Sequence, residues 1–341
     1  MKLRYLAAAI LALAGAALSA PADAQTKLKM VLNWKYQGPQ GYFFLAQDRG
    51  YFAREGLDVT MDPGTGSGAP ITLIASGAYD VGFGDMNALI DFATQKPDVA
   101  PIAVYAMFNQ PPFTIAVKSG SPIKTAKDLE GKTLGGPAND GALKLFPAFC
   151  TLAKIDCTGV KLTNIQPNLR EQLLMQGQFD GAFGFVNTIR FSAKLIGIDP
   201  DKELRFIKFG DYGMDLYSNV IMVSQKLAKE NPQAVRGLLK AINQGVVDAL
   251  KDPTAAVAAV AKRDQLIDLK IERERFDATI LDEMNHPEIA KIGLGDVDDA
   301  RLKASIDILA MAFDLKTKPP VEQVFNRSFL PPRAERPSSM K

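Results

Sequence analysis

One sixteen-residue pattern recurs in this chain at a spacing of 100 positions, and this repeat limits the folds that the chain can adopt. Residues 72–87 read TLIASGAYDVGFGDMN, and residues 172–187 read QLLMQGQFDGAFGFVN. Gly77, Asp80, Phe83, Gly84 and Asn87 are each matched by an identical residue 100 positions later, without a gap. Each copy has the pattern of a helical segment, a glycine stop and a short strand. Two similar α/β units in one chain are the simplest explanation.

Strand-like and helix-like segments alternate along the rest of the sequence, which favours a layered α/β fold. Residues 231–252 carry the strongest helix signal, with Asn231 as a cap and Pro253 as a stop. Two apolar strands, which begin near residues 113 and 219, are placed to cross between the units, and a double crossing forms a hinge. We therefore expect residues 25–112 and 221–341 to form lobe 1, with a polar, frayed tail from about 331, and residues 113–220 to form lobe 2.

The amino terminus has the features of a secretory signal peptide. Lys2 and Arg4 precede an apolar run over residues 6–18, and Ala22-Asp23-Ala24 supplies a cleavage signal. We expect cleavage near Ala24, release of a soluble protein into the periplasm, and no insertion into a membrane. A net charge of +2 with both signs scattered argues against a nucleic-acid partner.

Cys150 and Cys157 are the only cysteines, and six residues separate them. In an exported protein this pairing favours a structural disulfide. A redox site more often has two residues between its cysteines. The sequence contains a single histidine, His286, so a Ser-His-Asp triad or a histidine-rich metal site is not expected.

Several further segments resemble one known family. They are LNW (32–34), RGYFAREGLDV (49–59), SGAYDVGFGD (76–85), SGSPIKTAKDLEGKTLG (119–135) and YSNVIMVSQKLAKENPQAVRGLLKAI (217–242). Together they resemble the periplasmic solute-binding proteins of ABC importers, in the branch that serves nitrate, sulfonates, taurine and thiamine precursors. The resemblance covers nearly the whole exported chain and implies a type II periplasmic-binding-protein fold. It further implies a monomer whose lobes close over a small solute and dock on a membrane permease.

The only tryptophan, Trp34, stands where the first strand ends. Open α/β sheets bind ligands beyond the carboxyl ends of their strands, so we expect the indole at a cleft between the lobes. Packing against its own lobe is the alternative. The same reasoning selects residues at the other strand ends and in the glycine-rich loop 63–70, which can offer free N–H groups. The expected ligand-binding residues are Asn33, Trp34, Tyr36, Gln37, Gly66, Ser67, Gly68, Asp85, Asn87, Asn139, Phe185, Asn187, Asp211 and Tyr212.

Two residues near these positions have simpler explanations. Asp140 follows Asn139 at the start of an expected helix and is interpreted as its cap. Arg190 is the only arginine close to an expected strand end, and it can equally lie on a helix surface. Aromatic rings accompanied by Asn and Asp suit a planar heterocycle such as a thiamine pyrimidine precursor. A sulfonate, taurine or nitrate is the alternative ligand.

An enzyme and a periplasmic sensor module are the alternatives to a transport protein. A fungal relative of this fold makes the thiamine pyrimidine with a histidine, a pyridoxal-bearing lysine and a cysteine-rich motif. This chain lacks the cysteine cluster, and His286 lies in a late polar segment, so we expect no enzyme activity, no cofactor and no metal. A periplasmic sensor module would have the same sequence features, and this alternative stays open.

Overall fold

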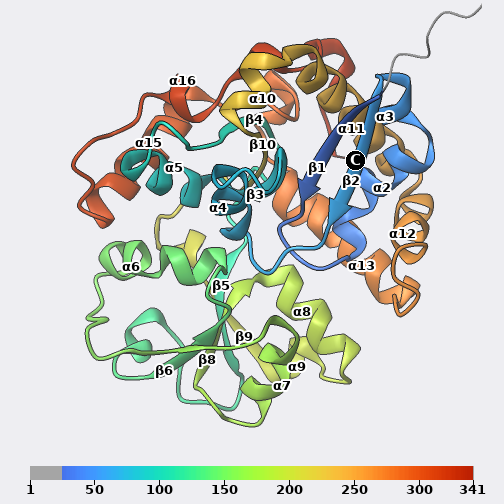
Figure 1. Cartoon of the computed structure of the whole chain (residues 1–341). Helices are drawn as coiled ribbons and strands as arrows, with labels where there is room; N and C mark the ends of the chain where they lie inside the picture. The colour runs from blue at the N-terminus through green and yellow to red at the C-terminus, as the bar shows by residue number, and fades with distance from the viewer. Residues whose placement is uncertain (1–24, 341) are drawn as a thin grey trace, which may run out of the picture.

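The structure is a computed structural model that describes residues 25–340, and the expected signal peptide lies outside them. It has two lobes, each built on a five-stranded mixed sheet (Figure 1). The sheet of lobe 1 has the order β2 (Leu57–Asp62), β1 (Thr26–Val31), β3 (Val81–Asp85), β10 (Asn219–Val223) and β4 (Ile102–Ala106). β1 runs parallel to β2 and β3, whereas β10 is antiparallel to both of its neighbours.

The sheet of lobe 2 repeats this plan. Its order is β7 (Lys161–Asn164), β6 (Thr133–Gly136), β8 (Gly181–Phe185), β5 (Phe113–Lys118) and β9 (Leu204–Lys208). β6 is parallel to β7 and β8, and β5 is antiparallel to β8 and β9. The expected fold class, two similar α/β lobes with a cleft between them, is therefore confirmed.

Helices cover both sheets. Between the strands of lobe 1 lie α2 (Gly41–Asp48), α3 (Tyr51–Arg54), α4 (Ala69–Ala75) and α5 (Met86–Gln95), and between those of lobe 2 lie α6 (Gly141–Ala153), α7 (Arg170–Met175), α8 (Val186–Leu195) and α9 (Pro200–Glu203). After β10 come α10 (Gln225–Glu230), α11 (Pro232–Lys251), α12 (Pro253–Ala261), α13 (Leu269–Thr279), α14 (Ile289–Ile292), α15 (Asp299–Ala312) and α16 (Val321–Val324). Single turns are η1 (Gly38–Gln40), η2 (Ala126–Leu129), η3 (Pro167–Leu169), η4 (Phe209–Tyr212), the π-helical η5 (Ile280–Met284), η6 (Arg327–Phe329) and η7 (Arg333–Glu335).

The 100-residue repeat is visible in the elements. β3 and β8 begin at positions 81 and 181, and the helices that follow them begin at 86 and 186. Both strands are buried along their whole length, which explains their continuous apolar and glycine composition. The copies differ at the turn into the helix. Asp85 caps α5 by accepting hydrogen bonds from two backbone N–H groups, whereas Phe185 makes no such bond at the start of α8.

Two crossings join the lobes. Residues 107–112 lead from β4 to β5, and residues 213–218 lead from η4 to β10. The crossings are bonded to each other, because the N–H groups of Met107 and Phe108 both donate to the carbonyl of Asn219, and Ser218 N donates to Phe108 O. This arrangement gives the double-stranded hinge that the fold implies.

The carboxyl-terminal tail differs from the expectation that it frays. The guanidinium of Arg336 is buried and donates to the carbonyl oxygens of Pro331, Gly293 and Leu294. Met340 is also buried. An arginine side chain has five N–H donors, so Arg336 can hold the tail in place through several hydrogen bonds, although the polar composition of the tail is typical of a disordered end.

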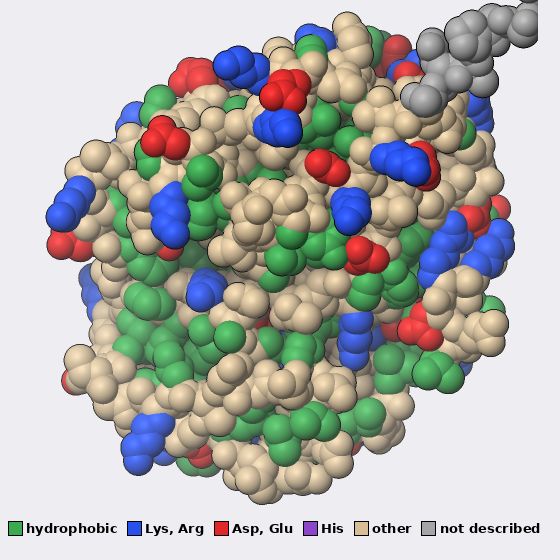
Figure 2. Space-filling view, viewed as in Figure 1, with side chains coloured by type: hydrophobic (Ala, Val, Ile, Leu, Met, Phe, Trp, Pro, Cys, Tyr) green, Lys and Arg blue, Asp and Glu red, His purple; other side chains and the backbone are tan. Residues whose placement is uncertain are grey.

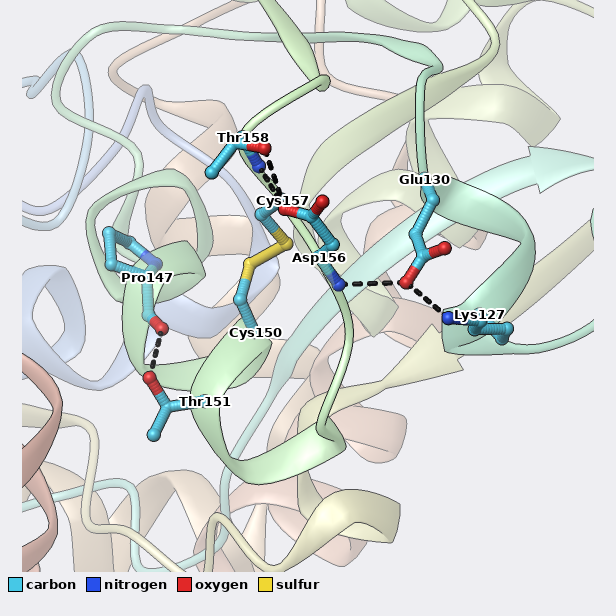
Figure 3. The surroundings of a disulfide bond; sticks show 8 residues. All are labelled: Lys127, Glu130, Pro147, Cys150, Thr151, Asp156, Cys157 and Thr158. Atoms are coloured by element: carbon cyan, nitrogen blue, oxygen red, sulfur yellow. Dashed lines mark hydrogen bonds and ion pairs between the residues drawn. A yellow bond between two sulfur atoms is a disulfide. The ribbon is translucent and has the colours of Figure 1, made fainter.

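Cys150 and Cys157 form the expected disulfide, with an S–S distance of 2.03 Å (Figure 3). The bond closes the loop after α6 of lobe 2. Glu130 holds the same loop from outside, because one of its carboxylate oxygens accepts from Asp156 N and from Lys127 Nζ, both at 2.7 Å.

Among residues 25–340, no helix is both long enough and apolar enough to cross a bilayer. On the face shown in Figure 2, Lys and Arg side chains lie interspersed with Asp and Glu.

Candidate functional site

A narrow cavity lies between the lobes beyond the ends of the strands, and the space in it that the centre of a water-sized sphere can reach is about 20 Å³. Lobe 1 contributes Asn33 and Trp34, which follow β1, and Ser67, which follows β2. The lining from lobe 2 comes from the starts of α6, α7 and α8, and it consists of Asp140, Arg170, Phe185 and Thr188.

The lobes are closed against each other beside this cavity. Gly68 N donates to the carbonyl oxygen of Asn139 across the gap at 3.0 Å. A Cβ at Gly66 would lie 2.3 Å from the same oxygen, and the φ of Gly66 is +146°, so glycine is required at this contact. The glycine-rich loop thus brings its backbone directly against lobe 2.

Trp34 is sandwiched between the lobes. Its loop is fixed because Gly64 N donates to Trp34 O at 2.9 Å and Gly66 N donates to Asn33 O at 3.1 Å. The side chain is only 6% exposed, and the guanidinium carbon of Arg170 lies 5.3 Å from the centre of the ring. This distance is in the range of a cation–π contact. The indole therefore forms one wall of the cavity and contacts lobe 2.

Arg170 is the centre of a buried charge cluster in lobe 2. Its Nε and Nη2 donate to Glu171 Oε1 at 2.9 and 2.7 Å, and its Nη1 lies 3.6 Å from Asp140 Oδ2. The three side chains are 1%, 7% and 4% exposed, in the order Arg170, Glu171 and Asp140. Burial raises the pKa of Asp140, and the charge of Arg170 acts against that rise. With both carboxylates ionised, the cluster carries one net negative charge.

Two polar atoms at the cavity lack partners. Trp34 Nε1 and Ser67 Oγ are both buried, and neither makes a hydrogen bond with any residue from 25 to 340. Buried donors and hydroxyls are normally paired, and an unpaired one carries a free-energy cost of about 1–3 kcal/mol. A ligand with an acceptor near Trp34 Nε1 and a polar group near Ser67 would satisfy both.

The structure brings part of the expected residues to this cavity. Asn33, Trp34, Ser67 and Phe185 line it. The contact between Gly66, Gly68 and Asn139 borders it, and Gly68, Asn87 and Asn139 line a neighbouring hollow between α4, α5 and α6.

Other expected residues point elsewhere. Tyr36 donates to Met61 O at 2.8 Å and packs on Phe44, so it faces its own lobe. Gln37 bonds with Gln40 around η1, and Tyr212 accepts a hydrogen bond from Ala126 N. Asp211 is exposed on η4.

Asp85 and Asn187 are buried but serve other contacts. Asp85 caps α5 and accepts from Ser218 Oγ at 3.2 Å, and burial raises its pKa to about 6. Asn187 Nδ2 donates to Asp282 Oδ2 at 3.3 Å, which joins α8 of lobe 2 to η5 of lobe 1.

The cavity also contains residues that the sequence reasoning did not select. Arg170 and Thr188 were missed, and Asp140 both caps α6, as interpreted, and lines the cavity. Arg170 lies two residues before the second copy of the repeat, at the place that corresponds to Pro70 of α4, so the repeat gave no signal for an arginine there. Arg190 pairs with Asp201 on the surface and does not line the cavity.

No three His, Cys, Asp or Glu side chains come together as a metal site anywhere between residues 25 and 340. His286 lies against Glu288, with its Nδ1 3.5 Å from Glu288 Oε2, and burial lowers its pKa.

A family model described as "NMT1/THI5 like" matches residues 40–256, which is more than half of the chain. The chain belongs to the NMT1/THI5-like family. A relative from Schizosaccharomyces pombe, named 4-amino-5-hydroxymethyl-2-methylpyrimidine phosphate synthase, is 25% identical over 263 residues, or 74% of this chain and 73% of its own. The riboflavin-binding protein RibY of Chloroflexus aurantiacus is 23% identical over 296 residues, or 85% and 82% of the two chains.

Solved structures place this NMT1/THI5-like chain among proteins with the periplasmic-binding-protein fold. The alkanesulfonate-binding protein SsuA from Xanthomonas axonopodis pv. citri, bound to MOPS, has a TM-score of 0.68 at 17% identity. The similarity covers 90% of this chain and all of SsuA. At this identity the likeness concerns the fold alone.

The expectation that the chain is not an enzyme is overturned by the comparisons. Relatives at 25–27% identity carry the name of a pyrimidine phosphate synthase, so the family includes enzymes. The expectation depended on the absence of a cysteine cluster, on the position of the single histidine, His286, in a late polar segment, and on export of the chain.

Proposed function

We propose that this NMT1/THI5-like protein is a periplasmic solute-binding component of an ABC importer. In this proposal it acts as a monomer, captures a planar heterocycle that carries amino or hydroxyl groups, and presents it to a membrane permease. The observation that carries the proposal is the cavity wall formed by Trp34, whose indole faces the space between the lobes with an unpaired Nε1. An aromatic face beside an unpaired donor suits a ring that stacks and also accepts a hydrogen bond.

The charges around the cavity favour a neutral or weakly basic ligand over an anion. A sulfonate or nitrate needs a cation with free donors. Among residues 25–340, Arg170 is the only cationic side chain that lines the cavity, and it is already engaged by Glu171 and lies beside Asp140. An added anion would therefore meet a guanidinium whose donors are engaged, whereas an amino group on a heterocycle could donate to Asp140.

Closure supplies the mechanism of capture. A ligand that touches Trp34 on one lobe and Phe185 or Asp140 on the other interacts fully only when the lobes meet. It therefore shifts the population towards the closed form by its difference in affinity for the two forms.

Calorimetry with three ligands tests the proposal. We expect 4-amino-5-hydroxymethyl-2-methylpyrimidine or riboflavin to bind, and methanesulfonate not to bind. Trp34→Ala should abolish that binding, while Tyr36→Phe, a change in the same loop on the side facing lobe 1, should leave it unchanged. Binding of methanesulfonate alone, or an unaffected Trp34→Ala variant, would refute the proposal.

Synthesis of a pyrimidine is the second candidate, favoured by the names of several relatives. A pyridoxal phosphate does not fit the residues present, because its phosphate would face Asp140 and Glu171 with Arg170 already paired. No reaction step that uses pyridoxal phosphate is therefore proposed. Expression of residues 25–341 in the cytoplasm of a strain that requires the pyrimidine distinguishes the candidates, since growth without the pyrimidine would indicate a synthase.

A further inference from the structure

A buried ion pair on α13 touches both walls of the cavity. Glu272 and Arg275 lie one turn apart on this helix of lobe 1, each is 1% exposed, and Arg275 Nη2 is 3.0 Å from Glu272 Oε1. Neither residue belongs to the lining of the cavity itself.

One end of the pair holds the loop that carries Trp34. Glu272 Oε2 accepts a hydrogen bond of 2.6 Å from the backbone N–H of Gly38, which directly follows that loop. A Cβ at Gly38 would lie 2.1 Å from the carbonyl oxygen of Glu272, so the backbones of loop and helix are in direct contact. The position of the indole is therefore tied to α13.

The other end of the pair reaches across to lobe 2. Arg275 Nη1 donates to the carbonyl oxygen of Thr188 at 3.2 Å and lies 3.5 Å from Ser192 Oγ, both on α8. Thr188 lines the cavity opposite the Trp34 loop. The carboxylate of Glu272 and the guanidinium of Arg275 thus connect the two walls of the cavity.

The burial of Arg275 makes its contact with α8 depend on closure of the lobes. Burial lowers the pKa of Arg275, the charges of Glu272 and Glu171 counteract it, and Arg170 adds to it. Arg275 Nε has no hydrogen-bond partner among residues 25–340. Burying a guanidinium costs free energy unless its N–H groups are hydrogen-bonded. Two acceptors near Arg275, Thr188 O and Ser192 Oγ, belong to lobe 2, which moves away when the lobes open.

We propose that Glu272 and Arg275 are positioning residues that fix the width of the ligand cavity and hold the lobes closed on the bound ligand. The inference rests on the proposed function, because it assigns a role in ligand retention at that same site. It predicts that the pair sets the lifetime of the complex, since the contact with α8 must break before the lobes can part.

Trp34 provides a readout that needs no ligand. It is the only tryptophan, and in the closed form it is covered by Arg170 of lobe 2. Opening exposes it to water and shifts its fluorescence emission to longer wavelength. Relative to the wild type, we expect Arg275→Met to shift the emission to longer wavelength both in the ligand-free protein, by lowering its closed fraction, and at saturating ligand, and we expect Arg275→Lys to restore the emission in part.

Ligand dissociation gives the second readout. Loss of the charged hydrogen bonds to α8 should speed dissociation of the bound heterocycle at least about tenfold, with little change in the association rate. The matched control is Lys194→Gln, which breaks the half-buried Lys194–Glu274 ion pair (2.8 Å) between the same two helices. Because solvent reaches both side chains and screens their attraction, this variant should stay closer to wild type than Arg275→Met in both readouts.

The outcomes separate a positioning role from a structural one. If Arg275→Met lowers the melting temperature but leaves both emission and dissociation unchanged, the pair only stabilises α13 and the inference is wrong. If Arg275→Met does not fold, Ser192→Val replaces it, since it crowds the same contact from lobe 2 and leaves Glu272 paired; unchanged emission would again refute the inference. An emission shift in a protein that binds none of the tested ligands would support the closure contact and count against the proposed function alone.

Discussion

Replacing Arg170 by methionine tests the charge arrangement on which the proposed ligand depends. Methionine fills similar space but leaves Asp140 and Glu171 buried without the guanidinium that lies 3.6 Å from one and 2.7 Å from the other. Removing one partner of a buried ion pair typically costs about 3–5 kcal/mol. For a protein of this length that corresponds to a fall in melting temperature of about 5–8 °C.

The loss of stability in the Arg170→Met variant should grow as pH rises. Burial already raises the pKa of Asp140, and without Arg170 this pKa rises further. A raised carboxyl pKa destabilises the folded state above that pKa and ceases to do so once the group is protonated. The variant should therefore fall further below the wild type in stability at pH 8 than at pH 5.

Differential scanning fluorimetry at pH 5 and pH 8 measures this effect. Arg205→Met is the control, because Arg205 lies in the same lobe and donates only to the carbonyl oxygens of Ile123 and Ser119. It should lose less stability and show no added pH dependence. An Arg170→Met protein that melts within a degree of the wild type at both pH values would refute the assignment of a buried charge cluster.

Three further predictions concern other parts of the molecule. Burial raises the pKa of Glu283 from 4.5 to about 8, so the stability of the fold falls as pH rises between these values, and Glu283→Gln should melt higher than wild type at pH 8.5 but nearly equally at pH 4. Reduction of the Cys150–Cys157 disulfide should cost about 2–3 kcal/mol in calorimetric unfolding and leave ligand affinity unchanged. Gly66→Ala should prevent closure, so solution scattering should detect no compaction on adding ligand.

Each of these predictions has a clear contrary result. A Glu283→Gln variant with the pH profile of the wild type would mean that Glu283 is hydrated in solution. Weaker ligand binding after reduction would place the disulfide in the functional site. Gly120→Ala is the control for Gly66, because a Cβ at Gly120 meets no atom within 4 Å. Compaction of both alanine variants would show that the contact with Asn139 is not tight.

Local patterns were sufficient to predict the scaffold. The offset of 100 residues placed β3 and β8 and the helices before them, α4 and α7, and the helix expected at 231–252 is α11 (Pro232–Lys251). These features depend on neighbours in sequence, such as the Asn231 cap and the glycine stops, so reasoning along the chain captures them.

The cavity could be predicted only in part. Trp34 and Tyr36 stand two residues apart in one loop, yet the first faces lobe 2 and the second donates to Met61 O within lobe 1. Which way each ring turns depends on contacts with distant segments. Arg170 escaped notice for the same reason, because its role arises from a carboxylate 30 positions earlier in the chain.

The order of strands in lobe 1 has a consequence for how the chain acquires its structure. Within the sheet β4 pairs with β10, its other pairings being isolated bridges to Phe325 and Gly295, and all of these partners are synthesised after lobe 2. Lobe 2, in contrast, takes every strand of its sheet from the continuous stretch 113–208. As the polypeptide is synthesised, lobe 2 can therefore complete its sheet by itself, whereas the sheet of lobe 1 stays incomplete until β10 has been made.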